Sequence, residues 1–247
     1  MAHPFEVSKE IEVDATPEEV WEAIATGPGI DSWFMGRNEV EPGEGGKVRM
    51  VLPAWALEAT ITVWDPPKRL VTDTGKDEDG RLMVFEYLIE AREGGSTVVR
   101  FVHSGFLAGD DWETEYEALK RGDPMYFHKL GEYLTYFRGR TATPVDVYGP
   151  QVADAEVAWT KIRRGLGLAG PVAEGDHVRL SPEGLAPIEG VIDWASPETL
   201  GVRTADGLYR FIYGLGGTVV LGHHIFSDVD PNTEEKAWQG WLEGAFA

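Results

Sequence analysis

Apolar and polar positions alternate through most of residues 45 to 106, which is the pattern of consecutive half-buried strands. In RLMVFEYLIEAR, Phe85 and Tyr87 fall on one face and Glu86 on the other. In TVVRFVHSGF, Phe101 and His103 share a face opposite Arg100. The pattern therefore predicts antiparallel strands with an aromatic inner face.

The period changes to that of a helix in ATPEEVWEAIA. Thr16 is predicted to cap this helix and Pro17 to be its first residue. Gly27, Pro28 and Gly29 are expected to break it and to leave room for one short further turn.

A long helix is predicted to close this half of the chain, capped by Asp123 and beginning at Pro124. Its apolar stripe recurs at helical spacing and consists of Tyr126, Leu130, Tyr133, Leu134 and Phe137. The order strand, helix pair, antiparallel strands and long helix describes a curved sheet wrapped around a terminal helix. Incomplete filling between such a sheet and its helix leaves a cavity.

The segment RGRTATPVDVYGP is rich in turn residues and predicts a boundary near residue 144. Beyond it, fragments of the first half recur in the same order, which favours a degenerate tandem repeat. The matched pairs are Trp159 with Trp21, Val178 with Val48, Trp194 with Trp64, Val220 with Val99, and His224 with His103.

Charge and composition exclude some classes of binding partner. The 22 basic and 42 acidic residues give a net charge of -20, which disfavours nucleic acid and anionic membranes. No window approaches the roughly 18 to 20 apolar residues of a membrane span, and the N-terminus shows no signal-peptide pattern. The chain has no cysteine, which excludes disulfides and thiolate sites. We expect a cytoplasmic protein, and its oligomeric state is left open.

Residues 5 to about 140 resemble the START/birch-pollen-allergen superfamily, also called SRPBCC, in the branch related to the heat-shock chaperone ATPase activator. The resemblance is carried by VDATPEEVWEAIATGPGIDSWF, VWDPPKRL and FVHSGF. It departs at Asp123, where many relatives carry Trp. The family includes polyketide cyclases and aromatases, lipid and hormone binders, chaperone cofactors and a calicheamicin self-resistance protein.

The resemblance implies an α+β fold of helix-grip units, each a curved antiparallel sheet wrapped around a long C-terminal helix. We expect a full helix-grip domain in residues 1–144 and a shorter, degenerate repeat in residues 145–247.

The leading functional hypothesis is a binding protein for an elongated, mostly apolar polyketide, polyene or polycyclic metabolite, held in a cavity within or between the two domains. Enediyne or other polyketide biosynthesis, or self-resistance, is the most specific form that the resemblance implies. A polyketide cyclase or aromatase is the first alternative, and a chaperone-cofactor-like interaction protein is the second. Whether the chain is an enzyme stays open.

His103 is a candidate to hydrogen-bond or deprotonate a ligand, or else a structural histidine of the fold. Aromatic and apolar residues are expected to line the ligand site. With the histidines they form the candidate set Trp33, Phe34, Trp55, Phe85, Tyr87, Phe101, His103, Tyr126, Phe127, Leu130, Tyr209, Phe211, Tyr213 and His224.

The pair His223 and His224 is not expected to hold a metal, because adjacent strand residues point to opposite faces. No P-loop, dinucleotide fingerprint or nucleophile elbow is found, and the glycines from Gly214 to Gly217 fall in a predicted hairpin. We therefore expect neither a metal nor another cofactor.

Overall fold

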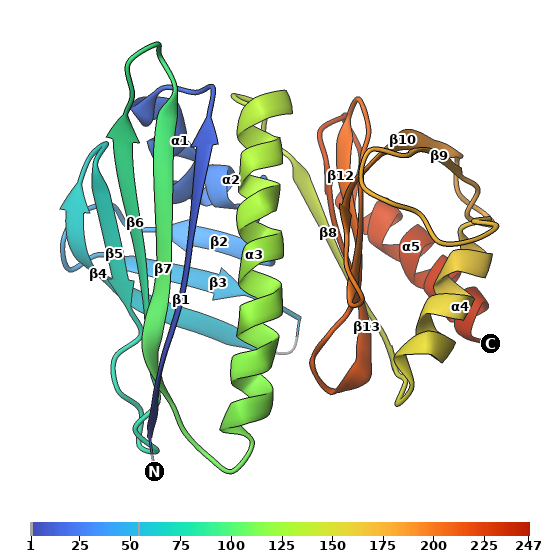
Figure 1. The fold of residues 1–247 in the computed structure, drawn as a ribbon, viewed down its shortest axis with the longest axis horizontal. Helices are drawn as coiled ribbons and strands as arrows, with labels where there is room; N and C mark the ends of the chain where they lie inside the picture. The colour runs from blue at the N-terminus through green and yellow to red at the C-terminus, as the bar shows by residue number, and fades with distance from the viewer. Residues whose placement is uncertain (1, 54) are drawn as a thin grey trace. The chain divides into compact units, whose positions relative to one another are not determined.

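The chain divides into two compact units, Met1–Thr141 and Ala142–Ala247, in a computed structural model that describes residues 2–53 and 55–247. Each unit is an antiparallel sheet followed by a helix (Figure 1). The predicted α+β class with two helix-grip units is confirmed. Among the described residues, no helix is long and apolar enough to cross a membrane.

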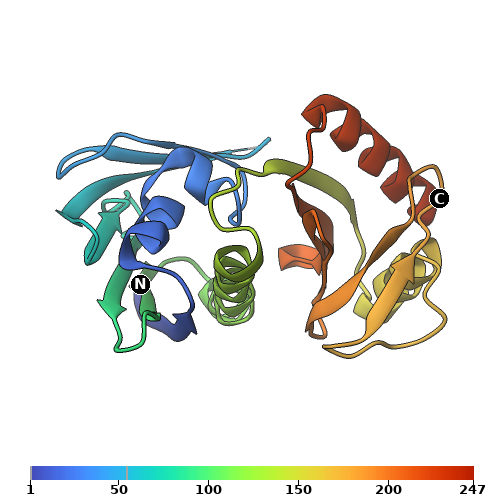
Figure 2. The same cartoon turned by 90° about the horizontal axis from the view of Figure 1, so that it is seen from above.

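The sheet of the first unit has seven strands in the order β1-β7-β6-β5-β4-β3-β2. It curves around the side on which the helices of this unit lie, with the long helix α3 seen end-on in Figure 2. The strands are β1 (His3–Val13), β2 (Arg37–Val40), β3 (Lys47–Val51), β4 (Ala56–Asp65), β5 (Arg69–Asp73), β6 (Leu82–Ala91) and β7 (Thr97–Leu107), and the helices are α1 (Pro17–Ala25), α2 (Gly27–Ile30) and α3 (Trp112–Tyr136).

Helix α1 begins as predicted, with Thr16 as its cap and Pro17 as its first residue. The Thr16 hydroxyl accepts a hydrogen bond from the Glu19 amide at 3.3 Å, and the Glu19 carboxylate accepts one from the Thr16 amide at 2.8 Å. The first helix ends before Gly27, as expected. The residues from Gly27 to Gly29 then form most of the short helix α2, whereas the further turn was expected after them. Thr26 caps that helix by accepting a hydrogen bond from the Gly29 amide at 3.0 Å.

The predicted start of the long helix at Asp123 and Pro124 is wrong. Helix α3 begins at Trp112 and passes through Pro124. A proline inside a helix removes one backbone hydrogen bond. Packing of α3 against the sheet offsets that loss, and Asp123 uses its carboxylate for a tertiary contact instead of a cap.

The predicted alternation of β6 and β7 is confirmed. Phe85 pairs with His103 and Tyr87 pairs with Phe101, so the four side chains share one face. Phe101 is buried and stacks on Phe127 of α3 at a centroid distance of 5.6 Å. This face of the sheet is therefore the one that packs against the helix.

The second unit repeats the order of elements with one strand fewer and without a counterpart of the short helix α2. Its sheet has the order β8-β13-β12-β11-β10-β9. The strands are β8 (Thr143–Gln151), β9 (His177–Leu180), β10 (Ile188–Ala195), β11 (Thr199–Arg203), β12 (Gly207–Tyr213) and β13 (Thr218–Ile225), the helices are α4 (Ala155–Gly165) and α5 (Pro231–Phe246), and a 3-10 turn, η1 (Leu215–Gly217), joins β12 to β13.

The predicted match of His224 with His103 is wrong by one residue. Phe211 pairs with Leu221, which places His223 and Tyr209 on the Phe211 face and His224 on the opposite face. The His223 ring lies 4.4 Å from Trp238 of α5, so His223 faces the helix as His103 does in the first unit. Sequence similarity between the two halves does not determine which face of the sheet a residue occupies, because a shift of one residue moves every side chain to the other face.

Thr97→Val tests the buried hydrogen bond that joins β7 to the start of α1. The Thr97 hydroxyl is fully buried and donates to the Ala15 carbonyl at 2.6 Å. The substitution keeps the shape but leaves that carbonyl without its donor, so we expect the free energy of unfolding to fall by about 1–3 kcal/mol in denaturant titrations.

Thr62→Val is the matched control, because the Thr62 hydroxyl is exposed and its bond to the Val71 carbonyl is long, at 3.4 Å. A change below about 0.5 kcal/mol is expected there. Equal effects of the two substitutions would contradict the assignment.

Candidate functional site

His103 is a buried histidine on the helix-facing side of β7, with 2% of its surface exposed. Its ring stacks on Phe85 of β6 at 4.2 Å, with an interplanar angle of 24°. Phe5 of β1 meets the ring edge-on at 5.0 Å. Aromatic side chains thus fix the plane of the imidazole.

Asp123 of α3 fixes which nitrogen of that imidazole carries the hydrogen. His103 Nδ1 lies 2.9 Å from Asp123 Oδ2. An ionised carboxylate only accepts hydrogen bonds, so Nδ1 is the donor. In the neutral ring Nε2 then holds a lone pair and can only accept.

His103 Nε2 has no hydrogen-bond partner among residues 2–53 and 55–247, and it is buried. Buried polar atoms are nearly always paired, so each exception calls for an explanation. One such explanation is a ligand that supplies the missing group.

Tyr87 stands next to this pair on the same face of β6. Burial raises the pKa of its hydroxyl above the usual tyrosine range, and the negative charge of Asp123 raises it further. The Tyr87 ring lies 5.0 Å from Phe101. Tyr87 therefore stays protonated at neutral pH and adds a hydroxyl to an otherwise apolar surface.

The inner face of β6 is less well covered than that of β7. Phe101 and His103 are buried, whereas Phe85 and Tyr87, their partners across the strands, remain half-buried. The side chains that face α3 thus do not fill the space beside β6 completely. We call the surface formed by Phe85, Tyr87, Phe101, His103 and Phe127 the aromatic wall.

The other predicted site residues of the first unit lie outside the aromatic wall or serve its packing. Trp33 is buried and donates from Nε1 to the Ala23 carbonyl at 2.9 Å, which is a structural role. Phe34 and Tyr126 contact each other at 4.9 Å. Leu130 is fully buried in the packing of α3, and Trp55 is 51% exposed.

Asp123 is the residue of the site that the sequence prediction missed, because it was assigned to a helix cap. Its spacing offers the signal, since Asp123, Phe127, Leu130 and Leu134 follow at i, i+4, i+7 and i+11. This places Asp123 on the buried stripe of α3.

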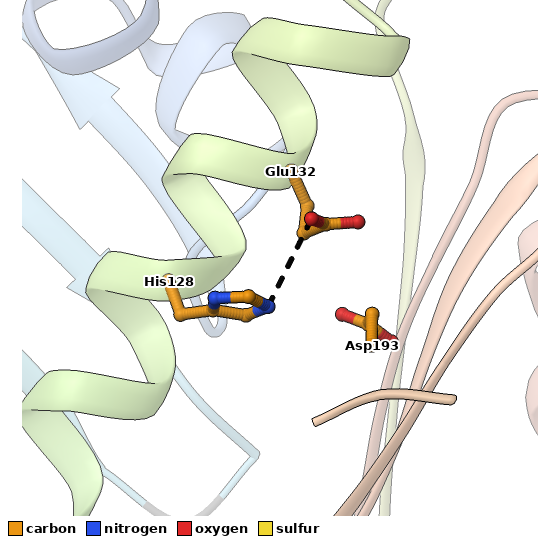
Figure 3. Close-up of side chains that lie close together, drawn as sticks. All are labelled: His128, Glu132 and Asp193. Carbon is orange, nitrogen blue, oxygen red and sulfur yellow. Dashed lines mark ion pairs between the residues drawn. The ribbon is translucent and has the colours of Figure 1, made fainter. Parts of the chain in front are cut away.

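His128 occupies a different side of α3. Figure 3 shows it beside Glu132, one turn further along, with 3.9 Å between His128 Nε2 and the carboxylate. Asp193, which is also labelled there, belongs to the second unit, where its carboxylate accepts a hydrogen bond from Arg210 Nη1 at 3.0 Å. Neither His128 nor Asp193 is part of the aromatic wall.

In the second unit, aromatic side chains of β12 pack against Trp238 of α5 at the corresponding place. Phe211 and Tyr209 each lie 6.0 Å from Trp238, and Tyr213 donates its hydroxyl to the Val152 carbonyl at 2.7 Å. His223 accepts a hydrogen bond at Nδ1 from the Arg210 amide at 3.1 Å, which is the reverse of the role of Nδ1 in His103. His224 lies on the other face, away from Tyr209 and Phe211.

A pocket of about 310 Å³ opens at one end of this second unit. Its lining includes Tyr209 and Trp238, but also the carboxylates of Glu189, Asp206 and Glu234. Burial raises the pKa of Tyr209 above the usual range, and Asp206 and Glu234 raise it further. An apolar ligand fits this acidic lining less well than it fits the aromatic wall.

Fold and site together define a helix-grip protein whose first unit carries a buried histidine–carboxylate pair. Residues 14–135 match the family model of "Activator of Hsp90 ATPase homolog 1-like protein". This part of the chain is an AHSA1-like domain of the SRPBCC superfamily. The second unit lies outside the match.

Several solved structures are similar to about half of the chain. BH1534 of Bacillus halodurans is 26% identical over 54% of this chain and 99% of its own, with a TM-score of 0.45. The Aha1 dimer of Colwellia psychrerythraea is 20% identical over 55% and 99%, with a TM-score of 0.44. CalU16 of Micromonospora echinospora is 24% identical over 53% and 74%, with a TM-score of 0.39. A search of curated proteins gave no match.

Asp123→Asn tests the electrostatic coupling within the site. It removes the charge that adds to the high pKa of Tyr87, so we expect that pKa to fall while remaining above the ordinary value of about 10, because burial persists. The absorbance of tyrosinate as a function of pH measures the Tyr87 pKa. The titration step that is missing in Tyr87→Phe is the one that belongs to Tyr87.

Asp110→Asn is the control, since it removes an exposed charge just before α3. It should leave the Tyr87 step in place. An unchanged Tyr87 pKa in Asp123→Asn would contradict the coupling.

Proposed function

We propose that the first unit binds a small, mostly apolar molecule against the aromatic wall. Its fold class generally binds hydrophobic ligands. The ligand would cover the half-buried rings of β6 and gain affinity from the apolar area removed from water.

The observation that carries this proposal is the contrast between two neighbouring strands. On β7, Phe101 and His103 are buried by α3, whereas Phe85 and Tyr87 on β6 face the same side and stay half-buried. Large aromatic side chains left half-covered beside a buried, unpaired ring nitrogen favour a ligand site over a filled core.

We propose a flat or conjugated molecule as the ligand, such as a polyketide, polyene or polycyclic metabolite, because the wall offers ring faces and few charges. A role in polyketide or enediyne biosynthesis, or in self-resistance to the product, is the most specific version. The net charge of -20 argues against a strongly anionic ligand.

Phe85→Ala tests the wall. Titration of the unaltered protein with a conjugated polyene or a polycyclic phenol, followed by tryptophan fluorescence, should show saturable quenching. Loss of the Phe85 ring should weaken binding about tenfold or more, since a ring contact is worth roughly 1–3 kcal/mol.

Phe106→Ala is the matched control, because Phe106 is a phenylalanine of β7 that is 41% exposed and lies on the opposite face from Phe101. The affinity of this variant for the same ligand should stay within about twofold of that of the unaltered protein. Equal losses in both variants, or no saturable binding by the unaltered protein, would overturn the proposal.

A polyketide cyclase or aromatase is a second candidate function, and the hydrogen bond between Asp123 and His103 favours it. A carboxylate that orients an imidazole is the arrangement of a general base. The imidazole would remove a proton next to a carbonyl of a bound poly-carbonyl chain.

His103→Gln tests this role. Gln keeps a polar group at the position but is no base at neutral pH. Cyclisation of a poly-carbonyl substrate should slow by about 100-fold or more. Turnover at the native rate would exclude the catalytic role of His103.

A further inference from the structure

We propose that the first unit selects ligands that present a hydroxyl group, such as a phenol or an enol, to Nε2 of His103. This inference rests on the proposed function and adds to it a hydrogen bond between the ligand and the protein. It predicts discrimination between a hydroxyl and its methyl ether.

The hydrogen bond at His103 Nδ1 has a defined direction. Asp123 Oδ2 lies 2.9 Å from His103 Nδ1, and a carboxylate is an acceptor, so the ring hydrogen sits on Nδ1. Nε2 is then an acceptor in the neutral ring, and it needs a donor. An ether oxygen or a ketone cannot supply one, whereas a hydroxyl can.

The described part of the chain does not itself supply that donor. His103 Nε2 is buried and has no hydrogen-bond partner within residues 2–53 and 55–247. Among the described residues, the aromatic rings in contact with the His103 ring are those of Phe5, Phe85 and Phe101, and none of them has a polar group. The nitrogen is therefore an acceptor set in an apolar surround.

The His103 ring lies next to a surface that the protein covers only in part. Phe85 stacks on the imidazole and is only half-buried, so the ring next to His103 forms part of the incompletely covered inner face of β6. A flat ligand that takes the place of solvent along β6 reaches the neighbourhood of His103 once the Phe85 side chain shifts. Tyr87, which stays neutral, offers its hydroxyl on the same face.

The counterpart histidine of the second unit shows the opposite arrangement. His223 accepts at Nδ1 from the Arg210 amide, so its neutral ring carries the hydrogen on Nε2. The acceptor at Nε2 is thus a property of His103 that the Asp123 carboxylate creates, and helix-facing histidines of this chain do not share it by default.

The experiment compares 2-naphthol with 2-methoxynaphthalene, which have the same ring system and differ in the donor. We expect the unaltered protein to bind the naphthol about tenfold more tightly, as one buried hydrogen bond warrants. In His103→Phe the two should bind within about twofold of each other. His177→Phe, which removes an exposed histidine of the second unit, should keep the full preference.

Nitrogen NMR of the unaltered protein gives a second test that needs no folded variant at position 103. Long-range correlations of the histidine rings should show a tautomer with the hydrogen on Nδ1, and 2-naphthol should shift its Nε2 resonance. Of the 6 histidines, His103 is the one that Asp123→Asn should perturb most.

The outcomes separate the two proposals. Equal binding of both probes overturns the hydroxyl selection and leaves the apolar binding function standing. A hydrogen on Nε2 in the free protein also overturns the selection, whatever the affinities. If neither probe binds nor shifts any ring resonance, the proposed function fails and this inference fails with it.

Discussion

The hydrogen bond between His103 and Asp123 joins the two layers on which the first unit depends. One partner lies on β7, the strand next to the edge strand β1, and the other lies on the long helix α3. Around this bond the contacts between the layers are apolar or aromatic, including the stacking of Phe101 on Phe127, and a second polar contact, the ion pair of Arg81 with Glu115, joins the start of β6 to the first turns of α3. Apolar packing is non-directional, so it holds the helix against the sheet without fixing its position along the strands. A hydrogen bond between two rigid elements does fix that position. The same bond decides which ring nitrogen remains available, so it links the stability of the fold to its chemistry.

The sequence predicted those features of the fold that depend on local pattern. Alternation placed Phe85 and Tyr87 on the inner face, and the Thr16 cap followed from side-chain chemistry within one turn. The start of α3 did not follow from local pattern, because Asp followed by Pro locally favours a helix that begins there over a helix that passes through, and α3 passes through. Only the contact of Asp123 with a residue 20 positions earlier decides between these two possibilities. The candidate site was therefore predictable in its aromatic part, and its acid was visible only after the fold brought it to His103.

The second unit shows the limit of matching residues between halves. The order of elements recurs, and the fold class follows from that order. The residue that faces α5 is nevertheless His223 and not His224, since the pairing of Phe211 with Leu221 sets the phase of β13. His103 and His223 thus lie at corresponding places in the two sheets. Their Nδ1 atoms have opposite roles, because Nδ1 of His103 donates to Asp123 and Nδ1 of His223 accepts from the Arg210 amide. Phe211 and Trp238 are buried in the interior of the second unit, while Tyr209 packs against them and lines the pocket with its acidic residues, so the two units have different surfaces to offer a ligand.

Pro124 has a mechanical consequence for α3. Having no amide hydrogen, it leaves the helix with one backbone bond fewer at the turn that also carries Asp123. A helix bends most readily where its ladder is interrupted. The interruption lies beside His103, because Asp123 is the residue before Pro124. The carboxylate that orients the imidazole therefore sits at the turn of α3 that the helix backbone holds least firmly, and contacts with the sheet have to keep it in place.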